Sequence, residues 1–506
     1  MLLQAQLRGY EPCGAKGLRA LRDSSAGPGA MGGRPVRTAK LNSEELTVVT
    51  RCATLDPTGA TLQCSPLHFR GHNVRGPVQT SSIDASASRR TSSAILVLIF
   101  LGGLINYMDR AAMGVLAPLI RRDLGLDAAQ LGLALGVFSI GYGIFTFAGG
   151  WAADRFGGRL VLGLSMLIWS VLCGLTGAVM GLMQLLVVRT AFGAGESPWI
   201  PASNKMLSQL VPESRFAAAF GISNAGQPIG AALAGPILAV ATVDLGWRVA
   251  FVVIASIGLI WTAAWWLLTA KLSAGTVAKR PRALPQAALS VATAASPSVR
   301  LSRVLTEPAI LATCFSLVAA NYAQTFFLAW FPSYLRVERG LAQTDMSIMT
   351  VIPWALGALG LACGGLLSSY ISKRVSSPLR GHKLMLTYCL IPGGICVALV
   401  PMVHSTHWAV GLMSTAIGLL FLAGPTYFAT VHQVAPRRYL GSAIGMMVIF
   451  TTCAGVVSPI LTGYLVKSSG GYASSFLVAA TMLVAAALVF NVFARPRQVR
   501  REVTLV

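Results

Sequence analysis

Long, nearly uninterrupted runs of apolar residues fill the chain from about Ser93 to Phe493. A helix that crosses a membrane takes about 20 mainly apolar residues, and this region has room for twelve such helices joined by short connections. The predicted spans are 94–119, 128–151, 160–179, 181–205, 216–243, 249–270, 308–335, 346–370, 384–403, 408–432, 442–466 and 473–493. The pattern predicts an all-α polytopic membrane protein with 12 transmembrane helices.

A polar connection at 271–307, which carries the sequence KRPR at 279–282, divides the spans six and six. After the second span stands Gly150-x-x-x-Asp154-Arg155-x-Gly157-x-Arg159, and a weaker copy from Gly365 to Arg374 follows the eighth span. Two similar halves joined by a polar loop are typical of transporters whose binding site lies between the halves. We predict six-helix halves at 93–270 and 308–494, a cytoplasmic linker at 271–307 and a cytoplasmic tail at 495–506.

The first 92 residues differ from the rest, because they are rich in Gly, Ser, Arg and Pro and contain no long apolar run. This composition predicts a disordered N-terminal extension over 1–92, and the apolar core of a secretory signal peptide is missing. Three origins remain open. The first is an over-extended reading frame, with Met31 as one alternative start. The second is a cytoplasmic tail. The third is a transit peptide, although the acidic residues of the segment argue against it.

Composition and charge agree with a membrane protein. The chain is 54% hydrophobic and only 11% charged, too little charge for a soluble globular domain. The net charge of +23 does not indicate nucleic acid, because most basic residues stand in short loops between apolar runs. With both termini in the cytoplasm and counting from Arg89 onward, 22 Lys and Arg residues fall inside and 6 outside, as the positive-inside rule requires. We expect a monomer in the lipid bilayer of the cell inner (plasma) membrane, with both termini cytoplasmic.

Cysteine spacing and motif content narrow the function. The nine Cys residues form no CxxC or Cys/His cluster, so neither a metal site nor a disulfide framework is predicted, and we expect no cofactor. No GxxxxGK[ST] loop is present, which argues against an ATP-driven pump. A membrane-embedded enzyme is the alternative of a different class, but no Ser/His arrangement or HExxH motif supports it.

Four ionisable residues remain well inside the spans: Asp109, Arg110, Arg189 and Glu196. A charge in the bilayer is costly, and it normally faces a polar cavity and has a partner. Two interpretations are open, a working site or two salt bridges that only join span 1 to span 4. Desolvation can cancel the attraction of a buried ion pair, and this favours the working site.

The segment GAGESPWIP at 193–201 surrounds Glu196 with two Gly and two Pro residues. Such residues loosen or kink a helix. We therefore predict a kink in span 4, which gives the carboxylate room for water or protons.

Further polar and aromatic residues lie within the spans. The polar ones have two possible roles, hydrogen bonding between helices or recognition of substrate hydroxyls in a central cavity. They are Asn106, Tyr107, Tyr142, Asn224, Gln227, Asn321, Tyr322, Gln324 and Tyr427. Trp261, Trp265 and Trp266 stand near a span end, where we expect them to form an interfacial belt.

The segment GWAADRFGGR at 150–159 resembles the loop 2–3 signature of the major facilitator superfamily. Within that superfamily, the chain resembles the anion:cation symporter family of galactonate, glucarate, hexuronate and phthalate permeases. The similar passages are NYMDR at 106–110, 189–201, GWR at 246–248 and WFPSYL at 330–335. The resemblance covers roughly 93–495. It implies the major facilitator fold, no enzymatic activity, and proton-coupled symport of a small organic carboxylate by alternating access.

The resemblance also implies roles for individual residues. Arg110 contacts the substrate carboxylate, Asp109 and Glu196 are the proton-linked acids, and Arg189 interacts with these acids or with substrate. Tyr107 and Gln227 are implied to form hydrogen bonds with the substrate. Asn321, Tyr322 and Gln324 are further substrate-binding candidates because they are polar residues within the seventh span. The gating candidates are Gly150, Asp154, Arg155, Gly157 and Arg159. The alternative is that these residues form a tight cationic turn that only fixes the orientation of the chain in the membrane.

Two departures from the family pattern bear on mechanism and substrate. Ser369 stands where the second loop signature has Asp, so the gate of the C-terminal half is expected to differ. The stretches PTYF at 425–428 and MVI at 447–449 predict a less polar C-terminal wall, which favours an aromatic or short organic acid over a sugar acid. Sodium coupling, uniport and exchange remain alternatives to proton symport.

Overall fold

The computed structural model describes residues 82–211, 213–270, 301–375, 377–436 and 439–495. By their contacts these residues all belong to one unit, Gln79–Val506. The predicted N-terminal extension up to residue 81, the linker from 271 to 300 and the tail from 496 lie outside the described residues.

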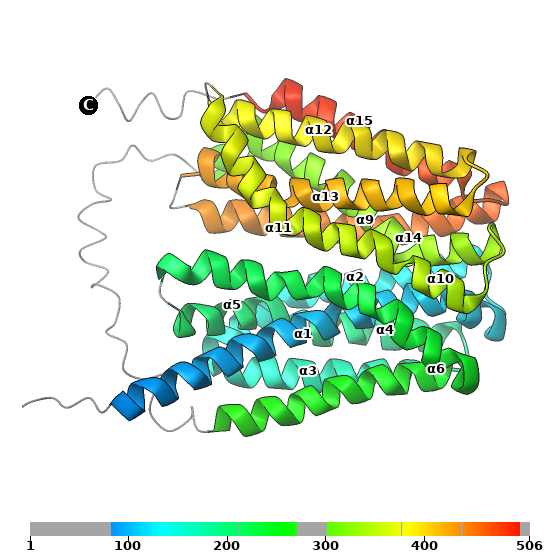
Figure 1. Cartoon of the computed structure of the whole chain (residues 1–506), viewed down its shortest axis with the longest axis horizontal. Helices are drawn as coiled ribbons and strands as arrows, with labels where there is room; N and C mark the ends of the chain where they lie inside the picture. The colour runs from blue at the N-terminus through cyan, green and yellow to red at the C-terminus, as the bar shows by residue number, and fades with distance from the viewer. Residues whose placement is uncertain (1–81, 212, 271–300, 376, 437–438, 496–506) are drawn as a thin grey trace, which may run out of the picture. The chain divides into compact units, whose positions relative to one another are not determined.

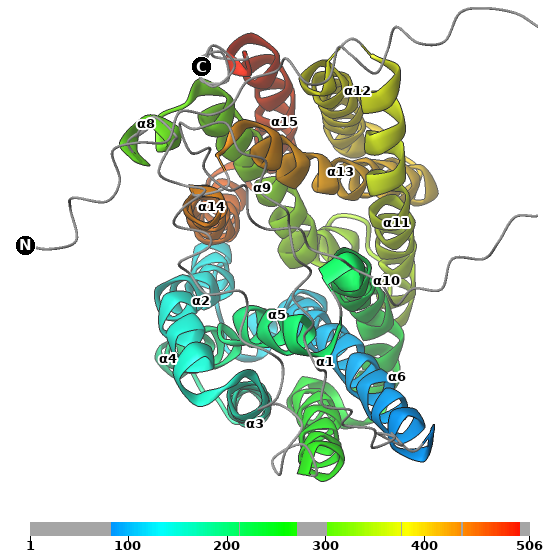
Figure 2. The ribbon, with the colours of Figure 1, turned by 90° about the vertical axis from the view of Figure 1, so that its left-hand side faces the viewer.

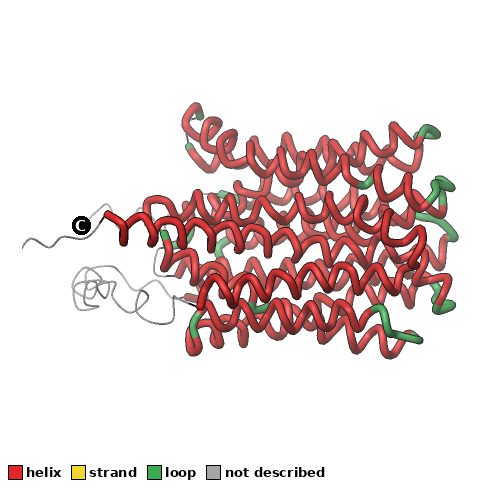
Figure 3. The backbone as a smooth tube through the Cα atoms, turned by 60° about the horizontal axis from the view of Figure 1, so that its bottom comes forward, coloured by secondary structure: helices red, strands yellow, loops and turns green. Residues whose placement is uncertain are grey.

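All regular elements in the described ranges are helices (Figure 3). They are α1 (Ser82–Asp123), α2 (Ala128–Phe156), α3 (Gly158–Thr176), α4 (Leu182–Glu196), α5 (Trp199–Leu210), α6 (Glu213–Thr269), α8 (Leu301–Leu305), α9 (Pro308–Val337), α10 (Gln343–Met349), α11 (Val351–Arg374), α12 (Pro378–Leu399), the 3-10 turn η2 (Val400–Met402), α13 (Thr406–Val434), α14 (Leu440–Ser469) and α15 (Ala473–Phe493). Figures 1 and 2 show α1–α6 gathered in one group and α9–α15 in another, the two halves of the fold.

Eleven helical segments of the described chain are long and apolar enough to cross a membrane. They coincide with eleven of the twelve predicted spans, and the predicted fold class is confirmed. The remaining span, predicted at 181–205, is divided between α4 and α5, each of which is too short to cross alone.

The division between α4 and α5 follows from proline. Pro198 and Pro201 have no backbone N–H to donate to the preceding turn. Ser197 Oγ instead donates to the carbonyl of Ala194 (2.9 Å), and Ser165 Oγ donates to the carbonyl of Gly195 (2.6 Å). The predicted kink beside Glu196 is confirmed, and side-chain hydroxyls satisfy two carbonyls beside it.

Two helix boundaries depart from the simple hydropathy pattern. The fifth and sixth spans, Gly221–Thr242 and Leu245–Thr269, are joined through Gly246, whose φ of 74° and ψ of 172° suit glycine alone. The extension predicted to be disordered through residue 92 is helical from Ser82, so that boundary was wrong. Once a span has formed, each further residue adds a hydrogen bond at little cost, and the helix propagates into the polar segment.

The predicted tryptophan belt is also wrong for Trp261 and Trp265. Both side chains are buried within the N-terminal half, and their rings stack with centroids 5.2 Å apart. Trp261 Nε1 donates to the carbonyl of Leu98 (2.8 Å) and Trp265 Nε1 to that of Arg159 (3.0 Å). A buried indole needs an acceptor for its N–H, and these carbonyls supply it inside the bundle.

The two halves meet closely where α2 crosses α14. A Cβ on Gly132 would lie 2.5 Å from the carbonyl oxygen of Pro459 and 3.0 Å from the Cα of Gly463, so glycine permits this approach. At the N-terminus of α2, Asp127 Oδ1 accepts from the backbone N–H of Gln130 (2.8 Å), while Oδ2 pairs with Lys467 Nζ at the end of α14 (3.0 Å). The Gln130 N–H and the Lys467 ammonium hold the pKa of Asp127 below its usual range, so the ion pair persists at neutral pH and is lost only on strong acidification.

Glycine also sets the distance between α2 and α4. A Cβ on Gly193 would lie 2.0 Å from the carbonyl oxygen of Phe138, and one on Gly141 would lie 2.0 Å from that of Thr190. Backbones in contact bring the side chains of α2 next to Arg189 and Glu196. This crossing therefore positions part of the site described below.

We expect Gly193→Ala to destabilise the protein by about 1–3 kcal/mol, the usual cost of overpacking a well-packed interior. The measurement is thermal unfolding of purified protein in detergent. Gly411→Ala on α13 is the matched control, because a Cβ there meets nothing within 4 Å. Equal melting temperatures for the two variants would contradict the tight α2–α4 crossing.

Candidate functional site

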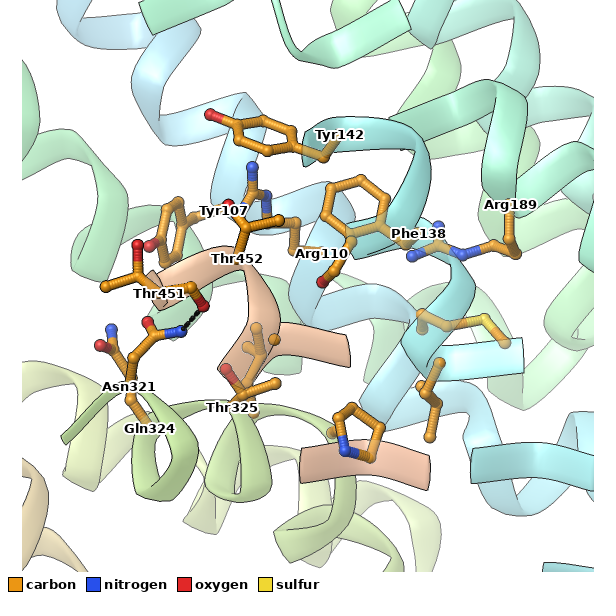
Figure 4. Close-up of a pocket in the computed structure, with 17 residues that line it drawn as sticks. Tyr107, Arg110, Phe138, Tyr142, Arg189, Asn321, Gln324, Thr325, Thr451 and Thr452 are labelled. Atoms are coloured by element: carbon orange, nitrogen blue, oxygen red, sulfur yellow. Dashed lines mark hydrogen bonds between the residues drawn. The ribbon is translucent and has the colours of Figure 1, made fainter. Parts of the chain in front are cut away.

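A cavity of about 160 Å³ lies between the two halves (Figure 4). Helices α1, α2 and α4 line it from the N-terminal half, and α9 and α14 line it from the C-terminal half. Its residues are Tyr107, Arg110, Met113, Leu135, Phe138, Ser139, Tyr142, Arg189, Asn321, Gln324, Thr325, Leu328, Ala329, Thr451, Thr452, Gly455 and Pro459.

Arg110 carries one of the two positive charges of this cavity. Its guanidinium lies 5.4, 4.8 and 4.7 Å from the ring centroids of Tyr107, Phe138 and Tyr142. Its Nε donates to Oε1 of Glu196 (2.7 Å), and its Nη2 pairs with the same oxygen. Glu196 is fully buried at the last residue of α4, so a carboxylate of the protein already neutralises Arg110.

Arg189 carries the second positive charge, and among the described residues no carboxylate forms an ion pair with it. Its guanidinium lies 5.1 Å from the ring centroid of Phe138 and 4.8 Å from that of Phe192. Within the described chain its Nε has no hydrogen-bond partner. The ring of Phe138 thus lies between the two guanidinium groups (Figure 4). Of these two cations, Arg110 forms an ion pair and Arg189 forms none among the described residues.

Asp109 does not line the cavity, although Arg110 beside it does. Successive residues of a helix point about 100° apart, and Asp109 faces α3 in the interior of the N-terminal half. There its Oδ2 accepts from Trp169 Nε1 (2.9 Å) and its Oδ1 lies 3.8 Å from Cys173 Sγ. The alternative of two salt bridges therefore does not describe this structure, because Arg110 pairs with Glu196 while Asp109 and Arg189 form no ion pair among the described residues.

The opposite wall of the cavity carries several polar side chains. Asn321, Gln324 and Thr325 reach it from α9, and Thr451 and Thr452 reach it from α14. Asn321 Nδ2 donates to the carbonyl of Thr451 (2.8 Å) and so ties the two helices together. The PTYF and MVI stretches line no part of the cavity, because its C-terminal wall lies on α9 and beyond the MVI stretch of α14. The expectation of a wall less polar than that of sugar-acid transporters stays a prediction.

Two predicted substrate-binding residues lie away from the cavity. Gln227 Nε2 donates to Asn224 Oδ1 on the same helix (3.0 Å). Tyr322 is buried in the C-terminal half, where its carbonyl accepts from Ser458 Oγ (2.9 Å). The face of α9 that lines the cavity runs through 321, 324, 325 and 328, and residue 322 points elsewhere. A substrate role for either residue stays a prediction.

Five residues that line the cavity were not predicted from the sequence: Phe138, Ser139, Thr325, Thr451 and Thr452. A Ser, Thr or Phe within a span is common and carries no signal of its own, since hydroxyls in helices often bond to the preceding turn. Thr451 and Thr452 Oγ1 both do so, donating to the carbonyl of Val448 (2.8 and 2.9 Å). Only the four-residue spacing between Asn321 and Thr325 offered a clue.

The predicted gating residues lie at the junction of α2 and α3. Asp154, which is exposed, accepts from Lys205 Nζ of α5 (2.9 Å), and Gly157 has a φ of 88° between the two helices. Arg159 donates from Nε to Thr269 Oγ1 of α6 (2.9 Å) and lies over the ring of Trp266. Gly150 stands opposite Pro201, and Arg155 is exposed. These contacts join helices of the N-terminal half, and a gating role stays a prediction.

Comparison with known proteins places this geometry in context. Residues 99–454 match the family profile described as Major Facilitator Superfamily. A hexuronate transporter of Bacillus subtilis is 38% identical over 404 residues, which cover 79% of this chain and 94% of the relative. A probable sulfoacetate transporter of Cupriavidus necator is 31% identical over 409 residues, with 79% and 93% covered. A probable L-galactonate transporter of Escherichia coli is 28% identical over 419 residues, with 79% and 89% covered.

A solved structure shares the fold. It is a bacterial homologue of the human lysosomal transporter Spinster in an inward-facing and occupied conformation. The TM-score is 0.64 at 18% sequence identity, and the match covers 80% of this chain and 97% of that one.

The Arg110–Glu196 pair predicts a strong energetic coupling. Arg110→Met and Glu196→Met each leave a buried charge without its partner, and each should cost about 3–5 kcal/mol. The double variant should be less destabilised than the sum of the two. Thermal unfolding in detergent measures this cycle, with Asp154 and Lys205 as the control pair, because an exposed pair contributes about 1 kcal/mol or less. Equal coupling in the two cycles would show that Arg110 and Glu196 are not a buried pair.

Proposed function

The chain belongs to the Major Facilitator Superfamily, and from that premise we propose that it is a secondary transporter for a small organic carboxylate of the sugar-acid class. The observation that carries the proposal is a buried Arg189 that forms no ion pair among the described residues, on one side of a cavity whose other side carries amide and hydroxyl groups. A guanidinium matches a carboxylate with two parallel hydrogen bonds. Amide and hydroxyl groups suit the hydroxyls of a sugar. Two of the relatives, a hexuronate transporter and a probable L-galactonate transporter, support this class.

The two cations have different parts in the proposed mechanism. Arg189 receives the substrate carboxylate, because no carboxylate of the described chain pairs with it. Arg110, expected from the resemblance to bind substrate, is held by Glu196 and becomes available when Glu196 gives up the ion pair. A proton on Glu196 neutralises the carboxylate and releases Arg110 toward the cavity. Protonation and anion binding then favour each other through one local field.

Coupling to a proton follows from this competition, and Asp109 is the second candidate acid. Sodium on the same carboxylates is the alternative coupling ion, and uniport or exchange is the alternative without one. Alternating access would require α2 and α14 to separate at the end where Asp127 pairs with Lys467. If both termini are cytoplasmic, the end of the bundle closed by Asp127 and Lys467 faces away from the cytoplasm. Asp154, Arg155 and Arg159 then lie at the cytoplasmic gate.

The substrate class is tested by uptake into proteoliposomes that contain the purified protein. Radiolabelled glucuronate and galactonate should be accumulated under an inward proton gradient, and unlabelled benzoate should compete weakly. A parallel series with a sodium gradient identifies the coupling ion. Preference for benzoate over both sugar acids would overturn the sugar-acid class and support the aromatic-acid alternative.

Arg189→Lys should weaken glucuronate binding about 10- to 100-fold, since the ammonium lacks the planar fork and loses charge-assisted hydrogen bonds. Equilibrium binding to purified protein measures the effect. Arg122→Lys, at an exposed position at the end of α1, is the control and should bind as the wild type does. Unchanged affinity in Arg189→Lys would remove Arg189 as the carboxylate anchor and return that role to Arg110.

Glu196→Gln should abolish accumulation driven by a proton gradient and preserve glucuronate exchange, because the amide resembles a permanently protonated acid. Both quantities are measured in the same vesicles. Glu338→Gln, at the end of α9, is the control, since its amide oxygen can still accept from the backbone N–H of Tyr472. Full accumulation by Glu196→Gln would exclude Glu196 from coupling and leave Asp109 as the candidate.

A further inference from the structure

Four tryptophan rings form a continuous ladder inside the N-terminal half, behind the cavity wall. Trp169 of α3, Trp199 of α5 and Trp261 and Trp265 of α6 follow one another with centroid distances of 5.2, 5.5 and 5.2 Å. All four side chains are buried. None of them lines the cavity between the halves.

One end of the ladder is the partner of Asp109. Trp169 is fully buried and donates its Nε1–H to Oδ2 of Asp109 (2.9 Å), while Cys173 lies one turn further along α3. Arg189 and Glu196 of α4 act on Asp109 through their charges, but neither forms an ion pair with it among the described residues. The indole N–H is therefore the shortest polar contact that the described chain makes to this carboxyl group.

The next ring connects Trp169 to the helix break beside Glu196. Trp199 is the first residue of α5, directly after Ser197 and Pro198, and its ring meets that of Trp169 edge to face. It occupies a notch in α1, where a Cβ on Gly102 would lie 2.0 Å from Cη2 of Trp199. A shift of the break would move Trp199, and through it the ring that orients Asp109.

We propose that Trp169 is a positioning residue for ion coupling, which holds the carboxyl group of Asp109 turned away from the cavity and ties it to the α4–α5 break that carries Glu196. The inference rests on the proposed function and adds to it a residue outside the cavity. The aromatic pair Trp169 and Trp199 then links Asp109 to the helix break at which Glu196 lies. Trp169 acts through Asp109 and touches no substrate.

The test compares Trp169→Phe with Trp261→Phe. Both variants keep an aromatic ring in the ladder and remove one indole N–H, but Trp261 donates to the carbonyl of Leu98 and not to an acid (2.8 Å). Each purified protein is reconstituted, and glucuronate exchange is measured beside glucuronate accumulation under proton and sodium gradients. Trp169→Phe should lower the initial rate of gradient-driven accumulation about tenfold, the scale of one hydrogen bond to a charged group, and leave exchange within about twofold of the wild type. Trp261→Phe should leave both unchanged.

Three results would overturn the proposal. Full accumulation by Trp169→Phe shows that its N–H does not orient a coupling group. Parallel loss of exchange and accumulation in Trp169→Phe shows a structural role alone. Equal loss of accumulation in both variants shows that the ladder acts only by packing. If wild-type protein exchanges no sugar acid, the proposed function itself fails, and the inference fails with it.

Discussion

The compensation of charge inside an apolar bundle is the constraint on which this structure depends. Four ionisable side chains lie in the N-terminal half at membrane depth, where an unpaired charge is costly. The bundle meets the cost in three ways: Arg110 pairs with a buried carboxylate, Arg189 lies against two aromatic rings, and Asp109 accepts from an indole. The aromatic faces attract the cations without neutralising them. Arg189 therefore lines the cavity as a cation that forms no ion pair among the described residues.

Close backbone contact at glycine, and its interruption at proline, make this compensation possible. Gly141 and Gly193 let α2 and α4 touch, which brings Phe138 against both arginines. Pro198 ends α4 at Glu196, and the buried hydroxyls of Ser165 and Ser197 satisfy the carbonyls beside the break. Without these glycines, the ring of Phe138 would not lie between the guanidinium groups of Arg110 and Arg189. Without the proline break, Trp199 would not be placed beside Trp169.

The two halves contribute unlike chemistry to the cavity. The N-terminal half supplies both cations and the aromatic rings, while the C-terminal half supplies amides and hydroxyls from α9 and α14. An anion with several hydroxyl groups can contact both halves at once, its carboxylate on one side and its hydroxyls on the other. Such a ligand would connect the two halves, which is the physical requirement for a substrate whose binding favours a change in their relative position.

Features that depend only on the transfer of a residue or an apolar run from water to lipid can be predicted from the sequence. Length and polarity of the apolar runs identified the spans, the proline and glycine residues around Glu196 located the kink, and the cost of charge in lipid selected Asp109, Arg110, Arg189 and Glu196. Only the tertiary structure decided which of these groups meet. Arg110 pairs with Glu196, 86 residues away, and Asp109 turns to α3, because the rotation of each helix depends on packing against its neighbours and not on its own hydropathy. For the same reason the sequence did not predict that Thr325, Thr451 and Thr452 line the cavity. Threonine is common in apolar spans, and its presence there does not indicate which way the side chain points.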